Sequence, residues 1–113
     1  MKNIIIGLTL LIFSFSANAQ EKKNKNAKYD IEVNGNCDMC KKRIEKAAFS
    51  VSGVKTAEWH SDDQTLHVII NEQKNSISEV KKAVAQVGHD TDEIKAADEQ
   101  FEKLHECCMY ERK

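Results

Sequence analysis

Three segments of the chain show the alternation of apolar and polar residues that predicts half-buried strands: Tyr29–Val33, Val54–His60 and Thr65–Ile70. The last two are joined by the polar loop 61–64, which has the length of a hairpin loop. Pairing across this loop sets Trp59 opposite Leu66 on an apolar face, which supports the register. The same register sets Glu58 opposite His67 on the other face, and we expect these two side chains to pair.

Two further segments carry apolar residues at the spacing of an amphipathic helix: Met39–Phe49 and Ile77–Val87. Asp38 stands where its carboxylate is expected to cap the first helix. Ser76 and Glu79 have the spacing of a capping box at the start of the second helix. Gly88 follows that helix at a position that favours a left-handed residue.

The elements combine into a known arrangement. After the second helix, Thr91–Lys95 predicts a short fourth strand and Asp98–Leu104 predicts one or two helical turns. The resulting order, βαββαβ, is that of a ferredoxin-like fold. The predicted fold class is therefore α+β, a βαββαβ sandwich with an antiparallel sheet, two helices on one face and a short C-terminal helical tail.

Residues 1–19 have the pattern of a secretory signal peptide. A basic start precedes the apolar run Ile4–Phe15 and the small residues Ala17-Asn18-Ala19, which fit the A-x-A cleavage pattern. The run is shorter than the about 20 residues of a bilayer span, which counts against an uncleaved membrane anchor. Cleavage after Ala19 predicts export to the periplasm, with no membrane span afterwards. The rest divides into a disordered leader (20–28), one domain (29–95) and a tail (96–113).

Composition narrows the range of functions. A chain of 113 residues has room for one domain, and a formal net charge of −1 gives no reason to expect nucleic acid as a partner. The absence of proline counts against a thioredoxin-type site, which needs a cis-proline beside its cysteines. The four cysteines lie in two close groups, Cys37 with Cys40 and Cys107 with Cys108, instead of being spread as a disulfide framework.

The Cys37-x-x-Cys40 motif lies where a loop enters the first predicted helix. Two sulfurs at this spacing are close enough to hold one ion or to bond to each other. The free N–H groups and the dipole at a helix start favour the thiolate, which is both the metal ligand and the nucleophile. Thiolates select soft or borderline ions such as Cu(I) and Zn(II). The motif therefore predicts a metal site or a redox pair.

From Tyr29 to Ile94 the chain resembles the heavy-metal-associated domain family, which includes small copper chaperones, periplasmic mercury-binding proteins and the N-terminal domains of metal-pumping P-type ATPases. The matching segments are Val33–Cys40, Ile44–Ala47, Val51–Val54 and Val87–Asp90. The resemblance implies a βαββαβ fold and one soft metal ion held by Cys37 and Cys40. It also implies binding and hand-over of the ion without catalysis, so we do not expect an enzyme. Cu(I) is the favoured ion, with Zn(II) and Hg(II) as alternatives.

Two positions depart from the family pattern. When the cysteines are aligned, Gly35 stands where the family usually has a methionine, so the loop before the site is expected to lie differently. His89 occupies a loop position where many members have an aromatic residue, and in this fold that loop lies beside the metal site. His89 is therefore a candidate additional ligand or a residue that supports the ligands, with a plain exposed histidine as the alternative.

The tail carries three more side chains that bind metals: His105, Cys107 and Cys108. Two interpretations stay open. In the first, these residues form a second metal cluster, or the tail is a flap that adds ligands to the site of Cys37 and Cys40. In the second, the tail only packs on the domain or forms a disulfide. Because a bridge between adjacent cysteines is strained, at most one of Cys107 and Cys108 is expected to face inward.

The sequence therefore predicts an exported, monomeric protein that carries or sequesters a soft metal ion. It would transfer the ion by ligand exchange to a metal-transporting P-type ATPase or another acceptor. A thiol–disulfide oxidoreductase using Cys37 and Cys40 is the alternative function, and a small domain with bridged cysteines is a third.

A basic helix face beside the motif is either a solvated surface or a docking surface for an acidic partner. It comprises Lys41, Lys42, Arg43 and Lys46.

Overall fold

The structure is a computed structural model that describes residues 23–112. The predicted signal peptide, 1–19, lies outside the described residues. The elements in chain order are β1 (Ala27–Glu32), α2 (Asp38–Phe49), β2 (Val54–His60), β3 (Thr65–Ile70), α3 (Ile77–Gln86), α4 (Asp98–Glu102) and the 3-10 turn η3 (Glu106–Cys108). Since β1 begins at Ala27, the last two residues of the predicted leader, 20–28, belong to this strand.

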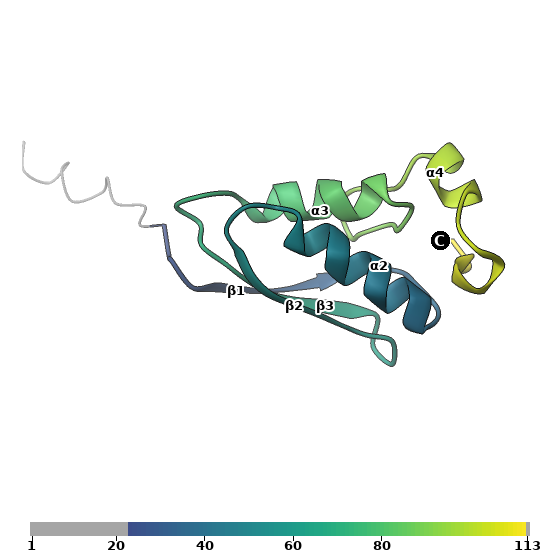
Figure 1. The fold of residues 1–113 in the computed structure, drawn as a ribbon, viewed down its shortest axis with the longest axis horizontal. Helices are drawn as coiled ribbons and strands as arrows, with labels where there is room; N and C mark the ends of the chain where they lie inside the picture. Colours follow the sequence, from purple (N-terminus) through teal and green to yellow (C-terminus); the bar gives the residue numbers. More distant parts are fainter. Residues whose placement is uncertain (1–22, 113) are drawn as a thin grey trace, which may run out of the picture.

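Three antiparallel strands form one sheet in the order β1-β3-β2, and α2 and α3 lie together on one of its faces (Figure 1). The predicted hairpin register is confirmed, because Trp59 pairs with Leu66 and Glu58 with His67. The tail folds back so that α4 lies beyond the C-terminal end of α3 and η3 lies beside the N-terminal end of α2 (Figure 1). The chain thus has the layers of the predicted α+β sandwich.

The predicted contact between the Glu58 and His67 side chains is wrong. His67 Nδ1 lies 2.6 Å from Asp30 Oδ1, and Glu58 instead contacts His60 Nε2 at 2.9 Å. The physical reason is that β3 is the central strand, so His67 has a second cross-strand neighbour on β1.

The fourth strand predicted over Thr91–Lys95 is also wrong, since within residues 23–112 this segment forms a single bridge, between Val33 and Thr91. The bridge lies at the free edge of β1, where a fourth strand would pair. Pairing stops there because the backbone N–H of Thr91 donates to the Ile94 carbonyl at 2.8 Å, which turns the chain back on itself. The Thr91 hydroxyl also binds this turn.

The helix starts differ from the predicted caps. Cys37, not Asp38, is the N-cap residue of α2, and Asp38 is the first helical residue. Ser76 is the N-cap of α3, but its side chain makes no capping hydrogen bond. Gly88 has the predicted positive φ, at 102°. A Cβ at Gly88 would come within 2.9 Å of the Leu104 side chain, so this glycine also lets the tail pack closely.

The core lies between the sheet and the two helices, and the tail contributes to it. Trp59 is 1% exposed, and its indole N–H donates to the Val33 carbonyl at 2.9 Å. Leu104, Cys108 and Tyr110 are buried in the same cluster as the residues of α2 and the sheet. In the described part of the chain, residues 23–112, no helix is both long and apolar enough to cross a membrane.

Candidate metal centre

Cys37 and Cys40 meet at the start of α2. Cys37 is the N-cap residue, and its carbonyl accepts the helical hydrogen bond of Lys41 at 3.0 Å. Residues three apart lie on the same side of a helix, so the two sulfurs face each other with Sγ atoms 3.8 Å apart. Cys40 is fully buried, whereas Cys37 is half-buried and borders solvent. All four cysteines are free thiols.

The loop before the helix passes close to the buried thiol. The backbone N–H of Asn36 donates to Cys40 Sγ at 3.3 Å. A Cβ at Gly35 would lie 3.1 Å from both Cys40 Cβ and the Trp59 ring, so a side chain there would have to push these groups aside. The Trp59 indole therefore lies against the position where the family usually has a methionine.

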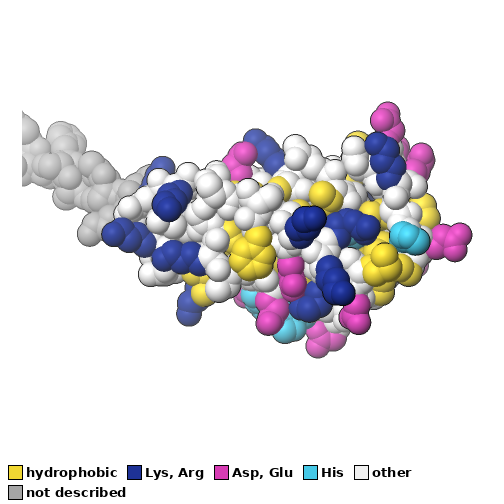
Figure 2. Space-filling view, in the orientation of Figure 1, with side chains coloured by type: hydrophobic (Ala, Val, Ile, Leu, Met, Phe, Trp, Pro, Cys, Tyr) yellow, Lys and Arg dark blue, Asp and Glu magenta, His cyan; other side chains and the backbone are white. Residues whose placement is uncertain are grey.

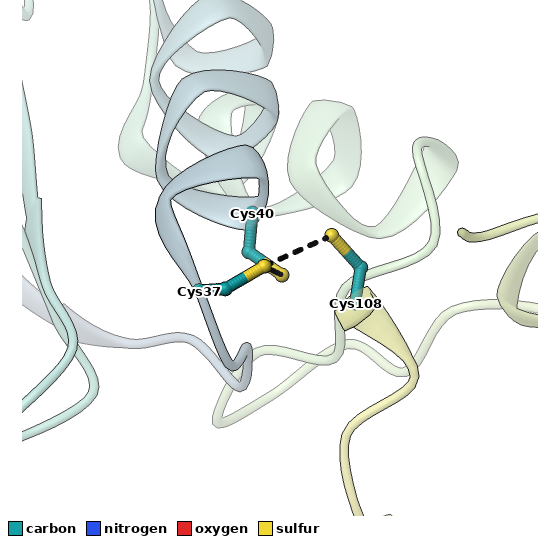
Figure 3. A group of neighbouring side chains, drawn as sticks. All are labelled: Cys37, Cys40 and Cys108. Atoms are coloured by element: carbon teal, nitrogen blue, oxygen red, sulfur yellow. Dashed lines mark hydrogen bonds between the residues drawn. The ribbon is translucent and has the colours of Figure 1, made fainter. Parts of the chain in front are cut away.

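The tail brings a third sulfur to this pair. Cys108 is fully buried, and its Sγ lies 3.8 Å from Cys37 Sγ. The sulfurs of Cys37, Cys40 and Cys108 all lie within 4.8 Å of one another and point toward a common centre (Figure 3). The tail packs on the domain as the second interpretation expects, without a disulfide, and this packing places one of its sulfurs beside the first pair.

The other candidate ligands of the tail do not join this group. Cys107 is exposed, and its Sγ lies 3.4 Å from Met39 Sδ, while its carbonyl accepts from the Cys37 thiol at 3.3 Å. His105 is exposed and is not part of the group. The expectation that only one of Cys107 and Cys108 faces inward is confirmed.

His89 is fully buried, so the alternative of an exposed loop histidine is wrong. Its Nδ1 lies 2.8 Å from the Asn34 carbonyl, which only accepts, so Nδ1 carries the hydrogen. The ring stacks on Tyr110 with centroids 5.6 Å apart. Its Nε2 is buried without a hydrogen-bond partner in the described chain, and the ring is not part of the sulfur group. Burial lowers the pKa of His89 and keeps it neutral.

Two tail residues beyond the cysteines hold the tail in place. The Tyr110 hydroxyl accepts from the Asp90 backbone N–H at 2.8 Å and donates to the Gly88 carbonyl at 2.9 Å. The Arg112 guanidinium donates to both carboxylate oxygens of Asp90, at 3.0 and 2.8 Å, and it covers the Phe101 ring. Sequence reasoning missed these contacts, because no local motif links residue 90 to residue 112.

The three thiols differ in their electrostatics. The hydrogen bond from the Cys40 backbone N–H lowers the pKa of Cys37 to about 7, which favours its thiolate form. Burial raises the pKa of Cys108, which stays protonated in the metal-free protein. Arg43 opposes that effect, because its positive charge nearby lowers the pKa of the Cys108 thiol. Arg43 Nη1 is buried with no partner in the described chain.

Comparison with known proteins places this geometry among metal-binding domains. No family model matches the chain. The copper chaperone CopZ of Staphylococcus epidermidis is 31% identical over 61 residues, which are 53% of this chain and 90% of that protein. The copper chaperone CopZ of Staphylococcus haemolyticus is 33% identical over the same shares.

Solved structures show the same relationship. A CopZ metallochaperone has a TM-score of 0.56 and 26% identity, and the match covers 57% of this chain and 98% of that one. The N-terminal domain of a potential copper-translocating P-type ATPase from Bacillus subtilis, solved in the Cu(I)-loaded state, has a TM-score of 0.56 and 28% identity. Its match covers 64% of this chain and 99% of that one. With this fold, identity and coverage, the chain belongs to the heavy-metal-associated domain family.

Proposed function

We propose that this protein binds one soft metal ion, with Cu(I) preferred, through Cys37 and Cys40 and passes it on by ligand exchange. The observation that carries the proposal is the pair of free sulfurs 3.8 Å apart at the start of α2. The relatives add support, since the CopZ proteins are copper chaperones and the ATPase domain was solved with Cu(I). Soft thiolates bind Cu(I) in preference to hard ions, and Zn(II) and Hg(II) are the alternatives.

The two cysteines have different roles, since one meets the incoming ion and the other retains it. Cys37 borders solvent and has a lowered pKa, which makes it the sulfur that meets an incoming ion. Cys40 is buried against the loop and holds the ion on the side away from water. In ligand exchange, an acceptor thiolate would attack the ion from the Cys37 side and replace the protein sulfurs one at a time.

The partner in this proposal is a metal-transporting P-type ATPase or a similar acceptor. Support comes from the likeness to the domain of a potential copper-translocating ATPase. Figure 2 shows Lys and Arg side chains gathered over the face where α2 runs, beside hydrophobic atoms. Of the basic residues of α2, Lys42 and Lys46 are exposed, whereas Lys41 pairs with Glu45 and Arg43 is half-buried. A basic face of this kind favours an acidic docking partner.

Export and the monomeric state are part of the proposal and rest on the sequence. The signal-like segment 1–19 supports export to the periplasm. A thiol–disulfide oxidoreductase is not favoured, because the relatives are metallochaperones and metal-binding domains, not enzymes. The proposal therefore has no catalytic residue.

A Cu(I) titration of the reduced protein under anaerobic conditions, in competition with a chromophoric Cu(I) chelator, tests the proposal. We expect one Cu(I) per chain, and we expect the variant Cys37→Ser/Cys40→Ser to leave all the copper with the chelator. Cys107→Ser is the matched control, because this thiol is exposed and outside the sulfur group. Unchanged copper binding by the double variant would refute the proposal.

A further inference from the structure

We propose that Cys108 is a third thiolate ligand, so that the tail closes a three-sulfur centre over the ion. This inference rests on the proposed function, since it adds a ligand to the site of Cys37 and Cys40. Three observations support it: the distances between the sulfurs, the way the tail is fixed, and the charge next to Cys108.

The sulfur distances fit three-coordinate binding. With metal–sulfur bonds of about 2.3 Å, three sulfurs around one ion in a plane lie about 4.0 Å apart, whereas two sulfurs on opposite sides lie about 4.6 Å apart. The distances from Cys37 Sγ to Cys40 Sγ and to Cys108 Sγ are both 3.8 Å. The two distances of 3.8 Å are nearer to the spacing in a three-sulfur centre than to that of a linear pair, and the three sulfurs, all within 4.8 Å of one another, fit such a centre with small adjustments.

The fold holds Cys108 in this position. Its backbone N–H donates to the His105 carbonyl at 2.8 Å, and its carbonyl accepts from the Tyr110 N–H at 2.9 Å. Arg112, two residues after Tyr110, donates to the buried carboxylate of Asp90. The thiol is thus fixed on both sides along the chain, and little conformational entropy is lost when it binds an ion.

The charge beside Cys108 suits a thiolate centre. Three thiolates around one Cu(I) carry a net charge of −2. Arg43, from α2, is close enough to lower the pKa of the Cys108 thiol, and its buried Nη1 has no hydrogen-bond partner within residues 23–112. On metal binding the Cys108 S–H bond breaks, a metal–sulfur bond forms and the proton leaves to water. Arg43 then compensates part of the remaining negative charge.

A third sulfur changes how the ion is released. An acceptor with two thiols can displace Cys37 at the open side, but Cys108 must also leave before the ion is free. The third ligand therefore slows transfer and favours retention of the ion. Faster release from a variant without the Cys108 thiol is the expected consequence.

The test compares two substitutions of Cys108 with the matched substitution of its neighbour. Cys108→Ser and Cys108→Ala remove the inward thiol, and Cys107→Ser removes the outward one. For the Cys108 variants we expect Cu(I) affinity to fall by about 10–100-fold or more. Loss of a group that only supports a ligand already lowers metal affinity by this amount, and loss of a ligand itself should cost no less. Transfer to a chelator should also become faster. Cys107→Ser should match the unaltered protein in both measurements.

A measurement on the unaltered protein covers the case in which the Cys108 variants fail to fold. Copper X-ray absorption of the Cu(I)-loaded chain should count three sulfur neighbours. A count of two would overturn the third ligand and leave the proposed function intact. If the unaltered chain binds no Cu(I), the proposed function fails and this inference fails with it. Equal affinities for Cys108→Ser, Cys108→Ala and Cys107→Ser would also overturn the inference.

Discussion

The two cysteine pairs of the chain differ in how many sulfurs they bring to the site. Cys37 and Cys40 are three positions apart at a helix start, and both sulfurs face the same centre. Cys107 and Cys108 are adjacent on a 3-10 turn, and one is exposed while the other is buried. Spacing along a regular element thus decides whether neighbouring cysteines act together. The second pair supplies one sulfur only, and its position depends on distant contacts of the tail.

The largest effect is expected where the tail is anchored. Arg112→Leu removes the cation that pairs with the Asp90 carboxylate, which is 3% exposed, and leaves it only the hydrogen bond from the Ala96 N–H. Removing one member of a buried ion pair lowers the free energy of unfolding by about 3–5 kcal/mol. Urea unfolding of the metal-free protein measures this loss.

The exposed ion pair of Lys82 and Glu79 provides the control for that experiment. Lys82→Ala should lower the free energy of unfolding by about 0.5 kcal/mol or less. If Arg112→Leu costs no more than Lys82→Ala, the tail is not anchored by Asp90, and the contrast between the two cysteine pairs loses its structural basis.

The next largest effect concerns the buried sulfur of the first pair. Cys40→Ser replaces a thiolate ligand with a hydroxyl that binds soft ions poorly, and we expect Cu(I) affinity to fall by about 100-fold or more. Competition with a Cu(I) chelator gives the ratio directly. Cys107→Ser serves as the reference and should stay within about twofold of the unaltered protein, since ordinary surface substitutions have small effects. A loss of similar size in both variants would mean that the pairs do not differ.

A smaller effect is expected at the hydroxyl of Tyr110. Tyr110→Phe leaves the Asp90 N–H and the Gly88 carbonyl buried without their partner, which costs about 1–3 kcal/mol of unfolding free energy. Tyr29→Phe is the matched control, because the Tyr29 hydroxyl binds Glu72 at a partly exposed site and should cost about 0.5 kcal/mol. Thermal unfolding of both variants tests the difference. Equal losses would show that Tyr110 is not a special anchor of the tail.

The smallest effect is a dependence of stability on pH. Because burial lowers the pKa of His89, the unfolded chain takes up a proton near pH 6.5 while the folded chain does not. The contribution of the neutral His89 ring to the free energy of unfolding is therefore fully present above pH 6.5. It is lost as the pH falls from 6.5 toward the lower folded-state pKa, by at most about 1.4 kcal/mol per pH unit.

His89→Phe keeps an aromatic ring beside Tyr110 and removes the titrating group. Urea unfolding between pH 7.5 and 5.5 should show a shallower pH dependence in this variant than in the unaltered protein. Asp90 acts in a different range, since Arg112 and the Ala96 N–H hold its pKa below the ordinary 3.8 despite burial. Identical pH slopes for the two proteins would contradict the assignment to His89.

Local patterns in the sequence predicted the hairpin and the first cysteine pair correctly. The bounds of β2 and β3 agree with the alternation of their residues, because side-chain period and burial coincide in a half-buried sheet. The closeness of Cys37 and Cys40 follows from their spacing at a helix start. The missing fourth strand could not be predicted, since Thr91–Lys95 has strand-like residues but satisfies its backbone in a turn.

The arrangement of the tail was beyond local reasoning. Cys37 and Cys108 are 71 positions apart, and the contact between their sulfurs depends on Tyr110 and Arg112 binding the 88–90 loop. The sequence indicated that at most one thiol of the second pair would face inward, but not which one. Burial of His89 is another consequence of the tail, because Tyr110 stacks on its ring.

A crystal structure of the Cu(I)-loaded protein, with anomalous diffraction at the copper edge, tests the central claim most directly. We expect one copper bonded to the Sγ atoms of Cys37, Cys40 and Cys108, with Cys107 outside the coordination sphere. A copper held by Cys37 and Cys40 alone, with Cys108 Sγ too far to bond, would contradict the third ligand. A copper bonded to neither Cys37 nor Cys40 would contradict the whole account.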